Sequence, residues 1–120
     1  MEKNVRLRIL LVMELIVERT DAEHGVTMQE ILQWLESNQI AGERKSIYED
    51  VHALQQYGLH ITYNKEDKTY RLMERQMDTE ELGLLVQAVR AADFIPENKE
   101  KQMIEHLMNY VSVYQRQIEN

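Results

Sequence analysis

The hydrophobic period of the chain changes at Gly58, and this change restricts the possible fold more than any other feature. Before Gly58 the apolar residues recur at intervals of three and four, which is typical of amphipathic helices. After it, residues 60–63 and 69–73 alternate polar with apolar or aromatic side chains, as β-strands do. The stretch between them, N-K-E-D-K, is polar and turn-forming. The sequence therefore predicts helices followed by a β-hairpin.

Two helices are expected in the first forty residues. The first covers about Lys3 to Arg19 and has two apolar stripes, which predicts burial on two of its sides. The stripes consist of Ile9, Val12, Met13 and Ile16, and of Leu7, Leu11 and Leu15. Thr27 stands three residues before Glu30, which is the spacing of a capping box. This pair predicts the start of the second helix.

A third helix is expected over residues 44–57, with Gly58 at its C-terminal end. Its inward face is expected to carry Ile47, Val51, Leu54 and Tyr57, and its opposite face Lys45, Tyr48, Glu49 and His52. Asp50 lies at the border of the inward face, where we expect it to pair with Arg6 or Arg8 of the first helix. Three helices followed by a hairpin is the order of a winged helix-turn-helix.

After the hairpin the pattern returns to helical spacing. Asp78 is expected to cap a fourth helix over residues 78–93, and Pro96 to open a fifth over residues 97–118. The fourth helix places on one side Leu82, Leu85, Val86 and Val89. The fifth has a heptad-like seam made of Ile104, Leu107, Val111, Tyr114 and Ile118. The sequence thus predicts a mainly α fold with a small β-hairpin.

The predicted elements divide the chain into two parts. Residues 1–75 are expected to form the winged helix-turn-helix domain, and residues 76–120 a helical linker or dimerisation segment. The two C-terminal helices predict a homodimer held through residues 78–93 and 97–118, because the seam is longer than one neighbouring helix needs. The alternative is that these helices fold back within one chain and cover each other.

Composition limits the chemistry that the chain can perform. Cysteine is absent, which excludes disulfides and thiolate catalysis. The four histidines lie far apart in the sequence, without the spacing of metal ligands. No Ser/His/Asp order and no glycine-rich phosphate loop accompanies the carboxylates. We therefore expect no enzyme, metal, cofactor or small-molecule ligand.

No membrane segment is expected either. The apolar stretch of residues 9–17 is too short and too charged to span a bilayer. No signal peptide is visible, and the lack of cysteine fits a cytoplasmic location.

The residues from Glu43 to Leu54 resemble a known family. They read E-R-K-S-I-Y-E-D-V-H-A-L and are similar to the recognition helix of the WYL-domain family of bacterial transcriptional regulators. The similarity extends to L-R-I-L (residues 7–10), Y-G-L-H-I-T-Y (57–63), T-Y-R-L (69–72) and a helical linker, E-E-L-G-L-L-V-Q-A-V (80–89). This resemblance implies a DNA-binding repressor or activator, with a ligand- or nucleic-acid-sensing WYL domain downstream of the matching region.

Double-stranded DNA is therefore the expected partner, read by helix 44–57 and the wing hairpin 60–73. Candidates for phosphate and base contacts are Arg44, Lys45, Ser46, Tyr48, His52, Lys65 and Lys68. The net charge of −7 requires any positive surface to be local. A continuous basic strip would favour DNA, and it would consist of Arg44, Lys45, Lys65, Lys68 and Arg71.

Two alternatives remain open for these residues. The basic first turn of the third helix could simply be a solvated helix start. The whole chain could be a protein–protein interaction module without DNA affinity, which the carboxylate of Glu49 in the groove-facing row would suit. That carboxylate could also accept a hydrogen bond from cytosine N4 in the major groove.

Overall fold

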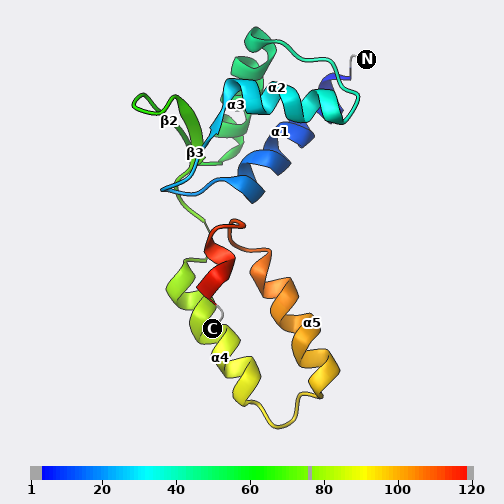
Figure 1. Ribbon diagram of the computed structural model, residues 1–120, viewed down its shortest axis with the longest axis vertical. Helices are drawn as coiled ribbons and strands as arrows, with labels where there is room; N and C mark the ends of the chain where they lie inside the picture. The colour runs from blue at the N-terminus through cyan, green and yellow to red at the C-terminus, as the bar shows by residue number, and fades with distance from the viewer. Residues whose placement is uncertain (1–3, 76, 119–120) are drawn as a thin grey trace. The chain divides into compact units, whose positions relative to one another are not determined.

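The computed structural model describes the backbone of residues 4–75 and 77–118, and the side chains of those residues up to 116. The chain forms two compact units, one ending at Glu74 and one beginning at Arg75 (Figure 1). It is mainly helical, with a small antiparallel sheet in the first unit, which confirms the predicted fold class.

Three helices build most of the first unit: α1 (Val5–Arg19), α2 (Met28–Ser37) and α3 (Arg44–Tyr57). Helix α2 begins with the predicted capping box, in which the Thr27 hydroxyl accepts from the Glu30 amide and the Glu30 carboxylate accepts from the Thr27 amide. Gly58 is the C-cap of α3, and its φ of +132° disfavours a residue with a Cβ atom. These local signals set the helix boundaries.

A sheet with the strand order β1-β3-β2 completes the unit. The predicted hairpin is present as β2 (Ile61–Asn64) and β3 (Thr69–Leu72). The sequence analysis missed β1 (Val26–Thr27), which pairs antiparallel with β3. Gly25 precedes β1 and allows this pairing, because a Cβ atom there would lie 2.1 Å from the Thr69 hydroxyl oxygen.

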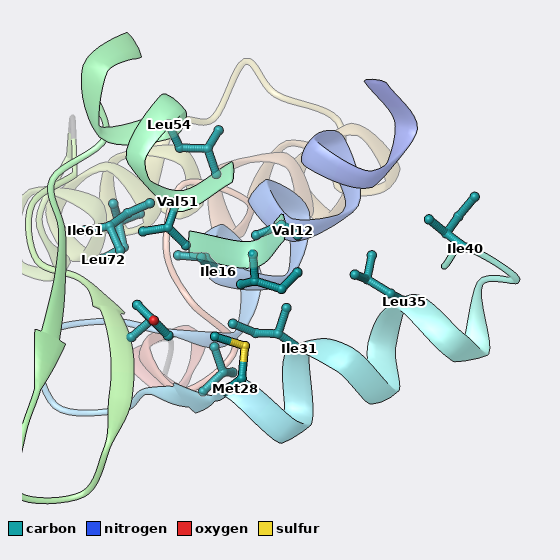
Figure 2. Packing of buried hydrophobic residues seen from close by; sticks show 13 residues of the cluster. Val12, Ile16, Met28, Ile31, Leu35, Ile40, Val51, Leu54, Ile61 and Leu72 are labelled. Carbon is teal, nitrogen blue, oxygen red and sulfur yellow. The ribbon is translucent and has the colours of Figure 1, made fainter. Parts of the chain in front are cut away.

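The hydrophobic core of the first unit lies between the three helices and the hairpin (Figure 2). Its thirteen buried members are Val12, Ile16, Val26, Met28, Ile31, Leu35, Ile40, Ile47, Val51, Leu54, Ile61, Tyr70 and Leu72. The second stripe of α1 is only partly covered, since Leu11 and Leu15 pack against the core and Leu7 is exposed. Burial of α1 on two sides is therefore correct for its C-terminal half and wrong at its start.

Polar side chains also join the elements of this unit. The Arg8 guanidinium donates two hydrogen bonds to the buried Asp50 carboxylate, Nε to Oδ2 at 2.7 Å and Nη2 to Oδ1 at 2.9 Å. This is the predicted pairing of Asp50, with Arg8 rather than Arg6 as the partner. The buried Thr20 hydroxyl donates to the Ile16 carbonyl at 2.7 Å and accepts from the Leu72 amide at 2.9 Å. Helix α1 is thereby fixed to both α3 and β3.

Tyr57 does not face inward as predicted, because 82% of its surface is exposed. Helix α3 ends at this residue and the chain turns at Gly58. The next apolar side chain, Leu59, packs against the core instead. The prediction from helical spacing that Tyr57 faces inward is therefore wrong at this last residue of the helix.

The second unit contains α4 (Thr79–Ala91), α5 (Glu97–Met108) and a short 3-10 helix, η1 (Gln115–Ile118). Asp78 caps α4 as predicted and forms a capping box with Glu81. Pro96 is the N-cap of α5, one position before its first turn. Helices α4 and α5 pack against each other around five buried residues: Leu82, Val86, Ile104, Met108 and Val111.

The continuous seam predicted over residues 97–118 is wrong. Helix α5 ends at Met108, and Tyr114 is exposed beyond it. The break has a local cause, since the Ser112 amide donates to the Gln115 side chain and the Gln115 amide donates to the Ser112 hydroxyl. This reciprocal pair starts η1 as a new element. The side chain of Ile118, the last member of the seam, lies outside the described part of the chain.

Candidate nucleic-acid interface

The first turn of α3 is open at its N-terminal end. Glu43 is the N-cap residue of this helix and makes no side-chain cap hydrogen bond. Helices α1, α2 and α4 differ, since each has a side chain that accepts from its first-turn amides. The free amides and the helix dipole of α3 favour an anion at this position.

Arg44 and Lys45 add positive charge to the same turn. Both side chains are exposed, and no ion pair forms with either in the part of the chain that the structure describes. Together with the open helix end, they can take up a phosphate without first losing an internal partner.

The remaining predicted contacts on α3 lie on its outward side. Tyr48 and His52 are exposed, and Ser46 is half-buried at the edge of the turn. Glu49 is exposed in the same row, so its carboxylate would approach any phosphate that this face meets. The five predicted α3 residues are thus at least partly accessible, and the exposed carboxylates of Glu43 and Glu49 lie beside them.

The turn of the wing is ordered by its own side chains. The Asn64 carboxamide oxygen accepts from the amides of Glu66 at 2.9 Å and Asp67 at 3.3 Å. Lys68 adopts a left-handed backbone with φ of +59°, which closes the turn into β3. Lys65 and Lys68 are both exposed there, so the two predicted wing cations are available to a partner.

Arg71 does not extend the basic strip. Its guanidinium pairs with the Asp67 carboxylate and donates to the Ala22 carbonyl at 3.0 Å. The Thr69 hydroxyl, which donates to Asp67 at 2.6 Å, is the largest cause that lowers the pKa of this carboxyl, and Arg71 adds to it. The positive charge of Arg71 is thus largely neutralised within the hairpin.

Two tyrosines of the hairpin were not predicted as part of this surface. Tyr63 and Tyr70 face each other across β2 and β3, with ring centroids 5.1 Å apart and an angle of 58° between the ring planes. The pKa of Tyr70 is raised, first by burial and then by the nearby hydroxyls of Tyr48 and Tyr63, while Arg44 acts in the opposite direction. Alternation within the hairpin marked both tyrosines as strand residues only, and nothing in the sequence connected them with Tyr48.

Other kinds of site are not visible in the described residues. Within residues 4–75 and 77–118, no three His, Asp or Glu side chains lie close enough together to hold a metal ion. None of the helices described has the length and apolar character needed to cross a membrane. Comparisons of the chain with protein-family models, curated proteins and solved structures return no match. Function is therefore inferred from the residues of this chain.

Proposed function

We propose that this chain is a cytoplasmic DNA-binding transcriptional regulator similar to the WYL-domain family, with α3 in the major groove and the β2–β3 wing beside it. One observation supports this proposal most directly. Arg44 and Lys45 are exposed, have no ion-pair partner among the described residues, and lie at the uncapped start of α3. Winged helix-turn-helix proteins use this end of the helix to approach phosphates and base edges.

Fluorescence anisotropy with a labelled random-sequence duplex, at several salt concentrations, tests this function. The double variant Arg44→Ala, Lys45→Ala is expected to bind more weakly. Its plot of log affinity against log salt should be shallower by about 1.8, since each lost phosphate contact removes about 0.9 from the slope. Equal binding by parent and variant would show that α3 is not the reading helix.

A control variant separates local contacts from the overall charge. The variant Lys99→Ala, Lys101→Ala also removes two positive charges, but from exposed positions on α5. It is expected to leave the affinity and its salt dependence close to those of the parent. A loss as large as that of the α3 variant would mean that net charge alone controls binding.

The wing is proposed to contribute less than α3, because Lys65 and Lys68 flank two acids. Removing both lysines should therefore weaken binding less than removing Arg44 and Lys45. The reverse order of effects would place the main contact on the wing.

A protein–protein interaction module is the second candidate function. It is favoured by the exposed carboxylate of Glu49 on the outward side of α3 and by the pairing of Arg71 with Asp67. The same assay separates the two functions. In a DNA-binding protein, Glu49→Arg should raise the affinity for random duplexes. A parent chain that does not bind duplexes even at low salt supports the interaction module.

We also propose that the regulator is a homodimer, because one domain with so few cations would bind a half-site weakly and a second linked copy multiplies the contact. The heptad-like seam does not support a dimer, since Ile104 and Val111 are buried within one chain. Instead, the exposed side of α4 carries Leu84, Leu85, Ala88 and Ala91 among polar side chains that include Glu80 and Glu81.

Sedimentation tests the dimer. The parent chain is expected to sediment as a dimer at tens of micromolar, and Leu84→Glu, Leu85→Glu as a monomer, because these side chains are 61% and 41% exposed and can change without opening the core. The control Leu10→Glu changes an exposed leucine of α1 and should leave the dimer intact. A parent chain that sediments as a folded monomer would exclude this assembly.

A further inference from the structure

Three tyrosines lie where α3 meets the wing: Tyr48 on α3, Tyr63 on β2 and Tyr70 on β3. We call this set the tyrosine face. Tyr48 is 50% exposed and Tyr63 is 48% exposed, whereas Tyr70 is 7% exposed and packs against Tyr63. The face therefore presents two accessible phenols supported by a buried ring.

The connection between α3 and β2 brings these residues together. The Gln55 side chain donates to the Ile61 carbonyl at 2.7 Å, which fixes the end of α3 against the start of β2. Tyr48 lies two turns before Gln55 on the same side of the helix. Tyr48 lies before the turn at Gly58 and Tyr63 after it, on the two elements that Gln55 joins. Tyr48, Tyr63 and Arg44 each influence the pKa of Tyr70, which agrees with this placement.

The hydroxyls of the tyrosine face are available to a partner. In the part of the chain that the structure describes, none of the three forms a hydrogen bond with another protein group. A phenol hydroxyl is a good donor, and it reaches phosphate oxygens in many protein–DNA complexes. The face is adjacent to Arg44, which the proposed function already places on a phosphate.

We propose that Tyr48 and Tyr63 donate hydrogen bonds to backbone phosphates of the duplex and thereby supply uncharged contacts beside Arg44 and Lys45. This inference rests on the proposed DNA-binding function; it adds Tyr63 to the phosphate contacts and assigns the Tyr48 hydroxyl a defined role in them. It also explains how a chain with net charge −7 and a broken basic strip can hold DNA. Neutral donors bring no positive charge to the phosphates, so they add affinity without adding counterion release.

The test uses the same random-sequence duplex, because phosphate contacts do not depend on the base sequence. Tyr48→Phe and Tyr63→Phe each remove one hydroxyl and keep the ring. Each variant is expected to bind about 3- to 10-fold more weakly than the parent. The slope of log affinity against log salt should stay unchanged, in contrast to the shallower slope expected for the double variant Arg44→Ala, Lys45→Ala. The control is Tyr57→Phe, which removes a hydroxyl from an exposed tyrosine at the far end of α3 and should bind like the parent.

The outcomes separate this inference from the proposed function. A parent chain without duplex affinity overturns both. A parent chain that binds, with Tyr48→Phe and Tyr63→Phe binding equally well, overturns the tyrosine contacts and leaves the DNA-binding function standing.

A single-stranded oligonucleotide of the same composition gives one further outcome. The parent chain could bind the single strand more tightly than the duplex. If Tyr48→Leu loses this preference and Tyr48→Phe keeps it, the Tyr48 ring stacks on bases. That result would overturn the role of the hydroxyl.

Discussion

The ion pair between Arg8 and Asp50 joins α1 to α3, and its loss should be the most damaging change to a polar contact in the first unit. The side chain of Asp50 is 5% exposed and that of Arg8 is 13% exposed. Breaking a fully buried pair costs about 3–5 kcal/mol, because the remaining charge is left without a partner. Arg8 lies near the start of α1 and keeps some contact with water, so we expect about 2–3 kcal/mol for Asp50→Ala.

Trp34 provides the assay for this prediction. It is the single tryptophan of the sequence, lies in the first unit, and donates its ring N–H to the Leu11 carbonyl at 2.8 Å. Its fluorescence during urea denaturation therefore follows the unit that contains the pair. With a denaturant slope of about 1 kcal/mol per molar urea, Asp50→Ala should lower the midpoint by about 2–3 M.

A double-mutant cycle with Arg8→Ala isolates the pair from other effects of the substitutions. The coupling energy is expected to be about 2 kcal/mol. The matched control is the more exposed pair of Asp67 and Arg71, whose coupling energy should be clearly smaller because water screens it. The reasoning about burial is refuted if the two coupling energies are equal.

The effect of alkaline pH on the coupling between Arg8 and Asp50 follows from the pKa of Arg8. Its pKa is raised above its usual value, mainly by the hydrogen bonds to Asp50, so its contribution to stability is complete across the neutral range and is lost only as the pH rises through the folded-state pKa. The coupling should therefore be constant between about pH 6 and pH 9.

Three further predictions concern local signals in the first unit. Thr27→Ala should lower the free energy of unfolding by about 1 kcal/mol, because it removes the cap of α2, and an unchanged urea midpoint would contradict this role. Gly58→Ala should cost about 1–2 kcal/mol because of its φ of +132°, and a variant as stable as the parent would show that the turn adapts. The pKa of Asp67 is lowered, so its contribution to stability is present above pH 3.8 and is lost as the pH falls through the folded-state pKa. Asp67→Asn should therefore make the urea midpoint less sensitive to acid. Identical acid sensitivity in variant and parent would exclude this contribution.

The elements that could be predicted from the sequence are those with local causes. Helical spacing together with Thr27 and Asp78 located the starts of α2 and α4, because a capping side chain acts within four residues. The pairing of Asp50 could be predicted because a charge at the border of an inward face needs a partner on the neighbouring helix. The hairpin followed from the change of period at Gly58.

The features that were missed depend on contacts distant in sequence or on competition between local signals. Strand β1 has only two residues and forms because the backbone of β3 is available for antiparallel pairing. The predicted seam extended past Met108 because apolar residues keep heptad spacing there. That spacing contains no information about the hydrogen bonds between Ser112 and Gln115, which start a new element. The tyrosine face could not be predicted, since Tyr48 comes near the two hairpin tyrosines only through the packing of α3 on β2.

The two units have hydrophobic cores with no residue in common. Each core can therefore open as its own cooperative unit, and amide hydrogen exchange should show one set of protected amides per core, with two separate free energies of opening. A destabilising substitution in one core should shift only the exchange rates of that unit. A substitution that weakens one core should therefore leave the other folded, so that the proposed DNA contact and the proposed dimer can change independently during evolution.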